Sequence, residues 1–184
     1  TLHGDYVQRT PREMLDESFG QAESTIAHEL FHHWFGDYVT AESWSNLTVN
    51  ESFANYSEYL WAEYKYGKDV ADEHHYDDLS NYLGSEKEAL KNLVRFHYAD
   101  KEEVFDLVSY QKGGRILHML RNQLGDQVFF KGLNLYLKQN AFKTGEAHQL
   151  RLAMEEVSGK DLNWFFNQWY FNAGHPSLDI SYAW

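Results

Sequence analysis

Apolar side chains recur at helical spacing along most of this 184-residue chain. Residues three or four positions apart lie on one face of an α-helix, so such a stripe predicts an amphipathic helix. The stripes are Ile26, Leu30 and Trp34 within 24–35; Val49, Phe53, Tyr56 and Leu60 from about Thr48; Ile116, Leu117, Leu120 and Leu124; Val128, Phe130, Leu133 and Leu137; Leu150, Met154 and Val157; and Leu162, Phe165, Phe166 and Trp169. The only prolines, Pro11 and Pro176, lie near the two ends, so the strongest helix breaker is missing in between.

Capping and glycine residues set the expected helix boundaries. These are Gly84 after a polar helix at 68–83, Gly125 with Asp126 as the next cap, Thr144 as a cap with Gly159 as the end, and Asp161 before the last helix. At the C-terminal end Leu178, Ile180, Tyr182 and Trp184 alternate with shorter or polar residues, which is a strand pattern. The sequence therefore predicts a mainly α fold, with one helical domain over 1–175 and a single strand in 176–184.

Composition narrows the function classes. A formal net charge of −12 disfavours nucleic-acid binding, which needs clustered Lys and Arg. No run of about 18 apolar residues is present, so we expect no membrane span. The chain contains no cysteine, so any metal must be held by His, Asp or Glu. We see no targeting leader, and the composition suits bacterial cytoplasm and periplasm equally.

The segment HELFH, from His28 to His32, carries the first candidate chemistry. Two histidines at i and i+4 lie on the same face of a helix and can reach one ion. Glu29, one position round the helix, would stand beside the ion, where a general base takes a proton from a metal-activated water. With ten histidines in the chain, the alternative is an accidental match on a polar surface helix.

A third ligand is available on the next predicted helix. A catalytic zinc site has three protein ligands and one open position, and Glu51 lies nineteen residues after His32. Asn55 and Glu58 share the helix face of Glu51 and are candidates to support the histidines from behind, although a plain polar face would look the same. His₂Glu also accepts cobalt, nickel or manganese, so zinc is inferred from ligand type. His33 is expected to face solvent, and no role is assigned to His74, His75, His97, His118 or His148.

These residues stand in a context that resembles the aminopeptidase N-like zinc metallopeptidases, the gluzincin aminopeptidases. HELFHHWFGDYVT matches the zinc motif and the segment after it, and NESFA at 50–54 matches the segment of the third ligand. SYQKGG at 109–114 resembles the family's Y-x-K-G segment. The resemblance implies a thermolysin-like helical part of a catalytic domain, one Zn²⁺ per chain held by His28, His32 and Glu51, and a peptide substrate. It also implies Glu29 as the base and Tyr110 as the donor to the substrate carbonyl oxygen.

The chain departs from this family in one functional segment. The family anchors the substrate amine with a glutamate in a Gly-x-Met-Glu-Asn segment upstream of the zinc helix, and residues 1–27 contain no such segment. We therefore expect a piece of a larger enzyme whose flanking β-domains are missing, with 176–184 as the start of the following one. Removal of N-terminal residues is the expected activity of the parent. The alternatives are a thermolysin-like endopeptidase, which needs no amine anchor, and a catalytically incomplete zinc-binding helical module.

Overall fold

The computed structural model describes residues 19–183, with side chains from residue 23 onward. The helices of this part are α1 (Phe19–Phe31), α2 (Thr48–Tyr66), α3 (Lys68–Leu83), α4 (Gly113–Leu124), α5 (Asp126–Gln139), α6 (Ala147–Ser158) and α7 (Asn163–Trp169). Two short strands, β1 (Val39–Ala41) and β2 (Lys143–Gly145), pair in parallel. The predicted mainly α fold is confirmed. None of the described helices has the length and apolarity needed to cross a membrane.

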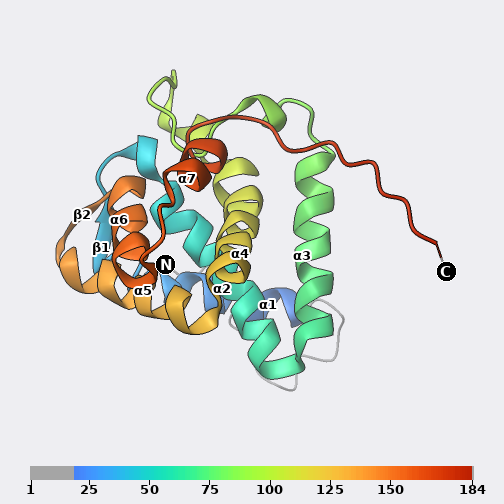
Figure 1. Ribbon diagram of the computed structural model, residues 1–184, viewed down its shortest axis with the longest axis horizontal. Helices are drawn as coiled ribbons and strands as arrows, with labels where there is room; N and C mark the ends of the chain where they lie inside the picture. The colour runs from blue at the N-terminus through green and yellow to red at the C-terminus, as the bar shows by residue number, and fades with distance from the viewer. Residues whose placement is uncertain (1–18, 184) are drawn as a thin grey trace.

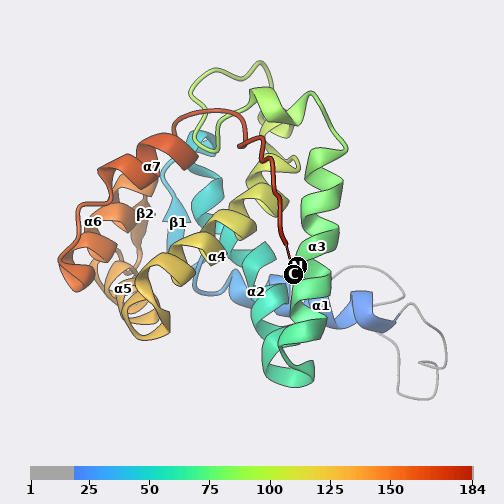
Figure 2. The ribbon, with the colours of Figure 1, turned by 45° about the vertical axis from the view of Figure 1, so that its right-hand side comes forward.

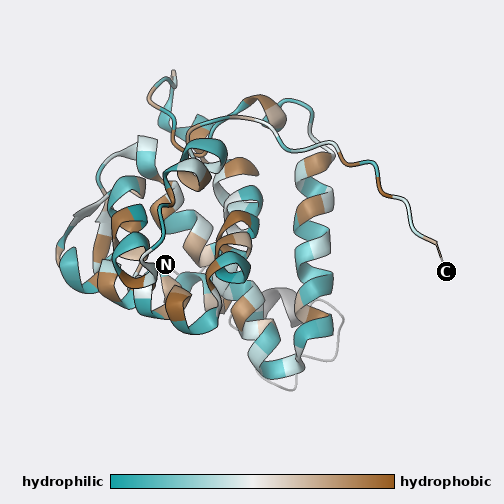
Figure 3. Cartoon of the chain, in the orientation of Figure 1, coloured by the Kyte–Doolittle hydropathy of each residue, from teal (hydrophilic) through white to brown (hydrophobic). Residues whose placement is uncertain are grey.

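Helix α2 is the centre of the fold. It packs against α1, α3 and α4, and its residues from Thr48 to Ser57 are all buried. Helix α3 stands on one side of α4, while α5, α6 and α7 lie on the other (Figures 1 and 2). The predicted stripes of α2 and α4 form the main core, where Phe53, Tyr56 and Leu117 are at most 1% exposed. Helix α3 is largely polar, as predicted (Figure 3).

The predicted apolar stripe of the first helix is not buried. Leu30 and Trp34 are 50% and 52% exposed, while Phe31 and Phe35 pack against the core. Leu30 lies on a face of α1 that the described residues leave uncovered. Helix α1 ends at Phe31, so Trp34 lies in a turn and the i+8 spacing no longer describes one helix face. Phe35 instead stacks on Phe53, with ring centroids 4.0 Å apart. This contact holds the turn after α1 against the N-terminal part of α2.

Two predicted caps and the predicted C-terminal strand are wrong. The Asp126 side chain accepts hydrogen bonds from Arg121 instead of capping α5. Thr144 lies in β2, and Glu146 is the cap residue of α6. Residues 173–183 form no strand. Figure 1 shows them passing over the end of α3, where His175 Nδ1 lies 3.2 Å from the Tyr82 hydroxyl, and then leaving the helices. A strand needs a neighbour for its backbone hydrogen bonds, and the described residues offer this segment none. Its assignment to a following β-domain stays a prediction.

Candidate metal centre

The turn and strand after α1 bring Glu51 back against the two histidines. Asn50 holds this connection, because its side chain donates to the Val39 carbonyl (3.2 Å) and accepts from the Ala41 amide (2.9 Å). Strand β1 is thereby tied to the first turn of α2, and Glu51 is the next residue. The sequence prediction that a short connection returns Glu51 to the first helix agrees with this geometry.

Three potential ligand atoms converge at this point. Glu51 Oε2 lies 3.3 Å from the Nε2 atom of His28 and 3.3 Å from the Nε2 atom of His32. The ligand atoms of the three residues all lie within 4.8 Å of one another. In the part of the chain that the structure describes, no other group of three His, Cys, Asp or Glu side chains meets this condition. Two imidazoles and a carboxylate are a common zinc donor set.

The outer nitrogens of both imidazoles are already occupied. His28 Nδ1 lies 2.9 Å from Glu58 Oε1, and His32 Nδ1 lies 3.0 Å from the carbonyl oxygen of Phe35. A carbonyl oxygen can only accept, so His32 Nδ1 carries the hydrogen. In the neutral rings both Nε2 atoms therefore present lone pairs to Glu51, whose buried Oε2 has no hydrogen-bond partner. Three converging lone pairs call for a cation, so the residues fit a metal ion.

The pKa values of these side chains show the same need for positive charge at the cluster. Burial favours the neutral form of His28 most strongly, but Glu51 and Glu58 outweigh it and raise the pKa of His28 to about 9. Burial likewise opposes the charged form of Glu51, yet the two histidines lower the pKa of Glu51 to about 2. A proton thus satisfies the cluster when no metal does, and metal binding must release it.

Tyr110 lies at this cluster, and Glu29 is near enough for its charge to act on Tyr110. The Tyr110 ring lies nearly parallel to that of His28, with centroids 5.9 Å apart. Burial, and then the carboxylates of Glu51 and Glu29, raise the pKa of the Tyr110 hydroxyl well above its ordinary value. Tyr110 therefore keeps its proton at neutral pH and can act as a hydrogen-bond donor.

Of the two candidate supporting residues, Glu58 bonds the Nδ1 atom of His28, a proposed ligand. Asn55 is buried with its side-chain oxygen against α4, where a Cβ on Gly114 would lie 2.2 Å from that oxygen. The Nε2 atom of His74 lies 3.6 Å from Glu58 Oε2, on the side of Glu58 away from the cluster. No sequence signal pointed to His74, since its i+4 partner Asp78 looks like an ordinary polar helix pair. His33 is exposed, as predicted, beside Asp37.

Comparison with known proteins decides the family. The model of the peptidase family M1 domain matches residues 4–169. The chain belongs to peptidase family M1. This M1 chain is 36% identical over 171 residues to tricorn protease-interacting factor F2 of Thermoplasma volcanium, covering 87% of itself and 21% of that protein. It is 34% identical over 182 residues to aminopeptidase N of Streptomyces lividans, covering 95% of itself and again 21% of the relative.

Solved M1 structures share the fold. An M1 zinc metallopeptidase variant from Deinococcus radiodurans, bound to a Tyr-Ser-Ala substrate, aligns with a TM-score of 0.73 and 26% identity, over 94% of this M1 chain and 37% of that one. The predicted resemblance and the helical part of a metallopeptidase catalytic domain are thereby confirmed. The M1 chain spans about a fifth of the length of the curated relatives it matches first.

Proposed function

We propose that this chain carries the metal centre of a zinc-dependent aminopeptidase. The convergence of His28 Nε2, His32 Nε2 and Glu51 Oε2, with both outer imidazole nitrogens engaged, supports the proposal most directly. Zinc held by these residues would supply Lewis-acid chemistry, acidifying a water and polarising a substrate carbonyl. The M1 relatives that are aminopeptidases favour removal of N-terminal residues over endopeptidase action. A peptide is the proposed substrate.

In this proposal Glu29 moves the proton. Glu29 directly follows His28 on α1, and its carboxylate accepts a proton from the attacking water. It then hands that proton to the nitrogen of the departing amine as the peptide bond breaks. Tyr110 donates a hydrogen bond to the substrate carbonyl oxygen, where negative charge grows in the transition state. Glu58 keeps His28 in the tautomer that presents Nε2 to the cluster.

Hydrolysis of a panel of aminoacyl-anilides by the zinc-loaded protein tests the proposal. We expect turnover of substrates with a free amine, loss of turnover with retained zinc in Glu29→Gln, and native turnover in Glu42→Gln, which changes an exposed glutamate. Equal cleavage of peptides whose N-terminal amine is blocked would support endopeptidase activity instead. Bound zinc without turnover on any substrate would show a metal site in a catalytically incomplete helical module.

A further inference from the structure

Tyr110 lies in an unusual stretch of backbone. Residues Val108–Lys112 form a single π-helical turn directly before α4, and the Lys112 amide donates to the Leu107 carbonyl five residues earlier (2.9 Å). Such turns are rare and are frequently found at functional sites. A π-turn has weaker internal support than an α-helix, so other contacts must hold it.

Asp106 supplies the first of these contacts. Its Oδ1 atom accepts from the amides of Val108 (3.1 Å) and Ser109 (3.0 Å), and its carbonyl accepts from the Tyr110 amide (3.1 Å). Three consecutive amides of the turn, the last of them that of Tyr110 itself, therefore bond to this one residue. Burial opposes ionisation, but hydrogen bonds from Arg95 and Lys91 outweigh it and lower the pKa of Asp106.

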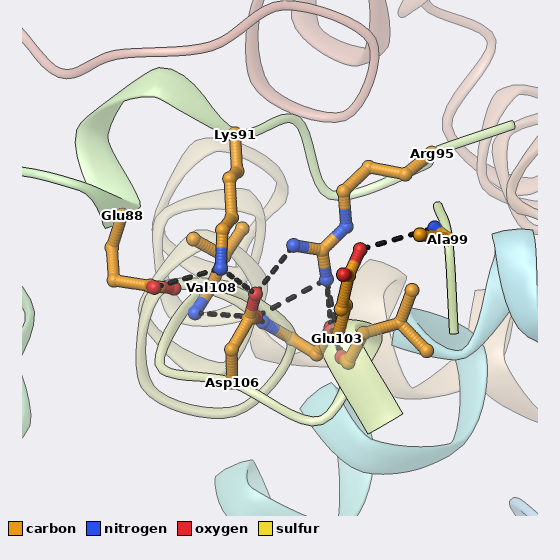
Figure 4. Close-up of polar contacts among 9 residues, drawn as sticks. Glu88, Lys91, Arg95, Ala99, Glu103, Asp106 and Val108 are labelled. Atoms are coloured by element: carbon orange, nitrogen blue, oxygen red, sulfur yellow. Dashed lines mark hydrogen bonds and ion pairs between the residues drawn. The ribbon is translucent and has the colours of Figure 1, made fainter. Parts of the chain in front are cut away.

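Arg95 holds Asp106 and the turn together, as Figure 4 shows. Its two guanidinium Nη atoms donate to the two carboxylate oxygens of Asp106, at 2.5 and 3.1 Å. Nη2 also donates to Ser109 Oγ (2.8 Å) and to the Val104 carbonyl (3.1 Å). Lys91 adds a bond to Asp106 Oδ2 (2.8 Å). The paired planar geometry of Arg and carboxylate fixes direction as well as distance.

The turn is also tied to the helix of the metal ligands. Ser52, the residue after Glu51, donates from Oγ to the carbonyl of Ser109, the residue before Tyr110, at 2.7 Å. Both serines are 0% exposed. This bond joins the immediate neighbours of a proposed metal ligand and of the proposed oxyanion donor, although the two serines are 57 residues apart in the sequence.

We propose that Arg95 and Asp106, acting through Ser109 and Ser52, are positioning residues that hold the Tyr110 hydroxyl at the metal cluster. The inference rests on the proposed function and adds residues that touch neither substrate nor metal. A misplacement of a reacting group by about 1 Å can cost roughly a hundredfold in rate. The network therefore has a catalytic consequence beyond whatever it contributes to stability.

The chain offers a matched control for Arg95. Arg121 also pairs through two nitrogens with one carboxylate, Asp126, at 2.8 and 2.9 Å. The two arginine side chains are equally buried, at 11% and 10% exposure. Arg121 lies near the far end of α4, however, and the Arg121–Asp126 pair donates to no atom of the π-turn. Arg95→Met and Arg121→Met thus each remove a two-nitrogen arginine–carboxylate pair with a buried arginine. The carboxylate is 11% exposed in the Arg95 pair (Asp106) and 69% exposed in the Arg121 pair (Asp126).

Kinetics with the zinc-loaded protein give the first test. We expect Arg95→Met to lower kcat roughly 10- to 100-fold with zinc content retained and KM little changed, and Arg121→Met to leave kcat near native. In a Tyr110→Phe background Arg95→Met should lower kcat by less than about twofold, because its effect acts through the missing hydroxyl. Full additivity of the two changes, or equal losses in both arginine variants, would overturn the positioning role.

Hydrogen exchange of the amides at 107–112 gives a readout that needs no turnover. We expect exchange there to speed up on the order of tenfold in Arg95→Met and to stay native in Arg121→Met. Unchanged exchange in Arg95→Met would overturn the inference. If Tyr110→Phe alone left kcat at the native value, the role of Tyr110 in the proposed function would fail instead, and the exchange data would still report whether Arg95 holds the turn.

Discussion

Single atoms decide the chemistry of the proposed centre. The sequence identifies His28, His32 and Glu51, because i, i+4 spacing on a helix is local and the third residue follows a short connection. It does not identify which imidazole nitrogen faces the cluster. That choice depends on the Phe35 carbonyl and on Glu58, thirty residues from His28, and only the folded chain shows both.

Replacement of Tyr110 by Phe removes one hydroxyl and little volume. If Tyr110 donates to the developing oxyanion, kcat should fall by about 10²–10³-fold, the usual loss for one such donor. Zinc content should stay at one per chain, since the three proposed ligands are unchanged. Steady-state kinetics with metal analysis check this. Loss of zinc in Tyr110→Phe would place the tyrosine among the metal ligands.

Lys112 predicts a pH dependence of stability. It is buried with no hydrogen-bond partner for Nζ, and burial, with a smaller effect of Arg95, lowers its pKa to about 8. Because the unfolded chain keeps the ordinary pKa near 10.5, it binds more protons than the folded chain between these values. The free energy of unfolding should therefore rise as pH increases from about 8 to 10.5.

Lys112→Met removes this charge while keeping a long side chain. We expect the variant to be more stable than the wild type at pH 7, by on the order of 2–3 kcal/mol, and the difference to vanish near pH 10.5. Urea unfolding across this pH range measures it. Lys138→Met, at an exposed position of α5, serves as the control and should show no such trend. A pH-independent difference for Lys112→Met would contradict the assignment.

At the scale of elements, α2 and α4 approach each other through glycine. A Cβ on Gly113 would lie 1.8 Å from Ser52 Oγ, the atom that bonds the Ser109 carbonyl. Gly113→Ala should therefore destabilise the protein by about 1–3 kcal/mol and also lower turnover, because Ser52 must move. Gly84→Ala, at the end of α3 with an ordinary φ of −68°, should do neither to a comparable extent. Chemical denaturation and anilide hydrolysis compare the two variants.

Elements formed by local interactions could be predicted from the sequence, and features that depend on long-range contacts could not. The helices were predictable because their periodicity and terminal glycines are local, as in α3 and α4. The exposure of Leu30 was not, because it depends on which face of α1 other segments cover. That of Trp34 was not, because α1 ends before this residue. The π-turn and its network were missed as well. The one local signal was Asp106 three residues before Ser109, a capping pattern in a stretch without clear periodicity.

For the whole molecule, metal binding should couple to folding. The proposed ligands come from α1 and α2, so an ion that binds only the folded chain stabilises the contact between them. At a free zinc concentration a hundred times Kd the gain is about 2.7 kcal/mol, which corresponds to a rise in Tm of roughly 5–10 °C. Differential scanning calorimetry with zinc and with a chelator measures it.

Adjacent histidines provide the control for this prediction. His32→Ala should lose most of the zinc-dependent rise in Tm, since it removes a converging Nε2 atom. His33→Ala should keep the rise, because His33 is exposed and directed at Asp37. A rise that survives in His32→Ala would move the stabilising ion to another place in the chain.

The π-turn has a consequence for changes in chain length. A π-turn contains one residue more than an α-turn spanning the same rise, so deletion of one residue between Tyr110 and α4, either Gln111 or Lys112, would let the segment close as regular α-helix. One residue corresponds to about 100° of rotation about the helix axis, so Tyr110 would turn away from the histidines while α4 stayed in place. Homologous segments should therefore vary in residue type more readily than in length. A homologue with a one-residue deletion between the tyrosine and the following helix should not place that tyrosine at the metal cluster.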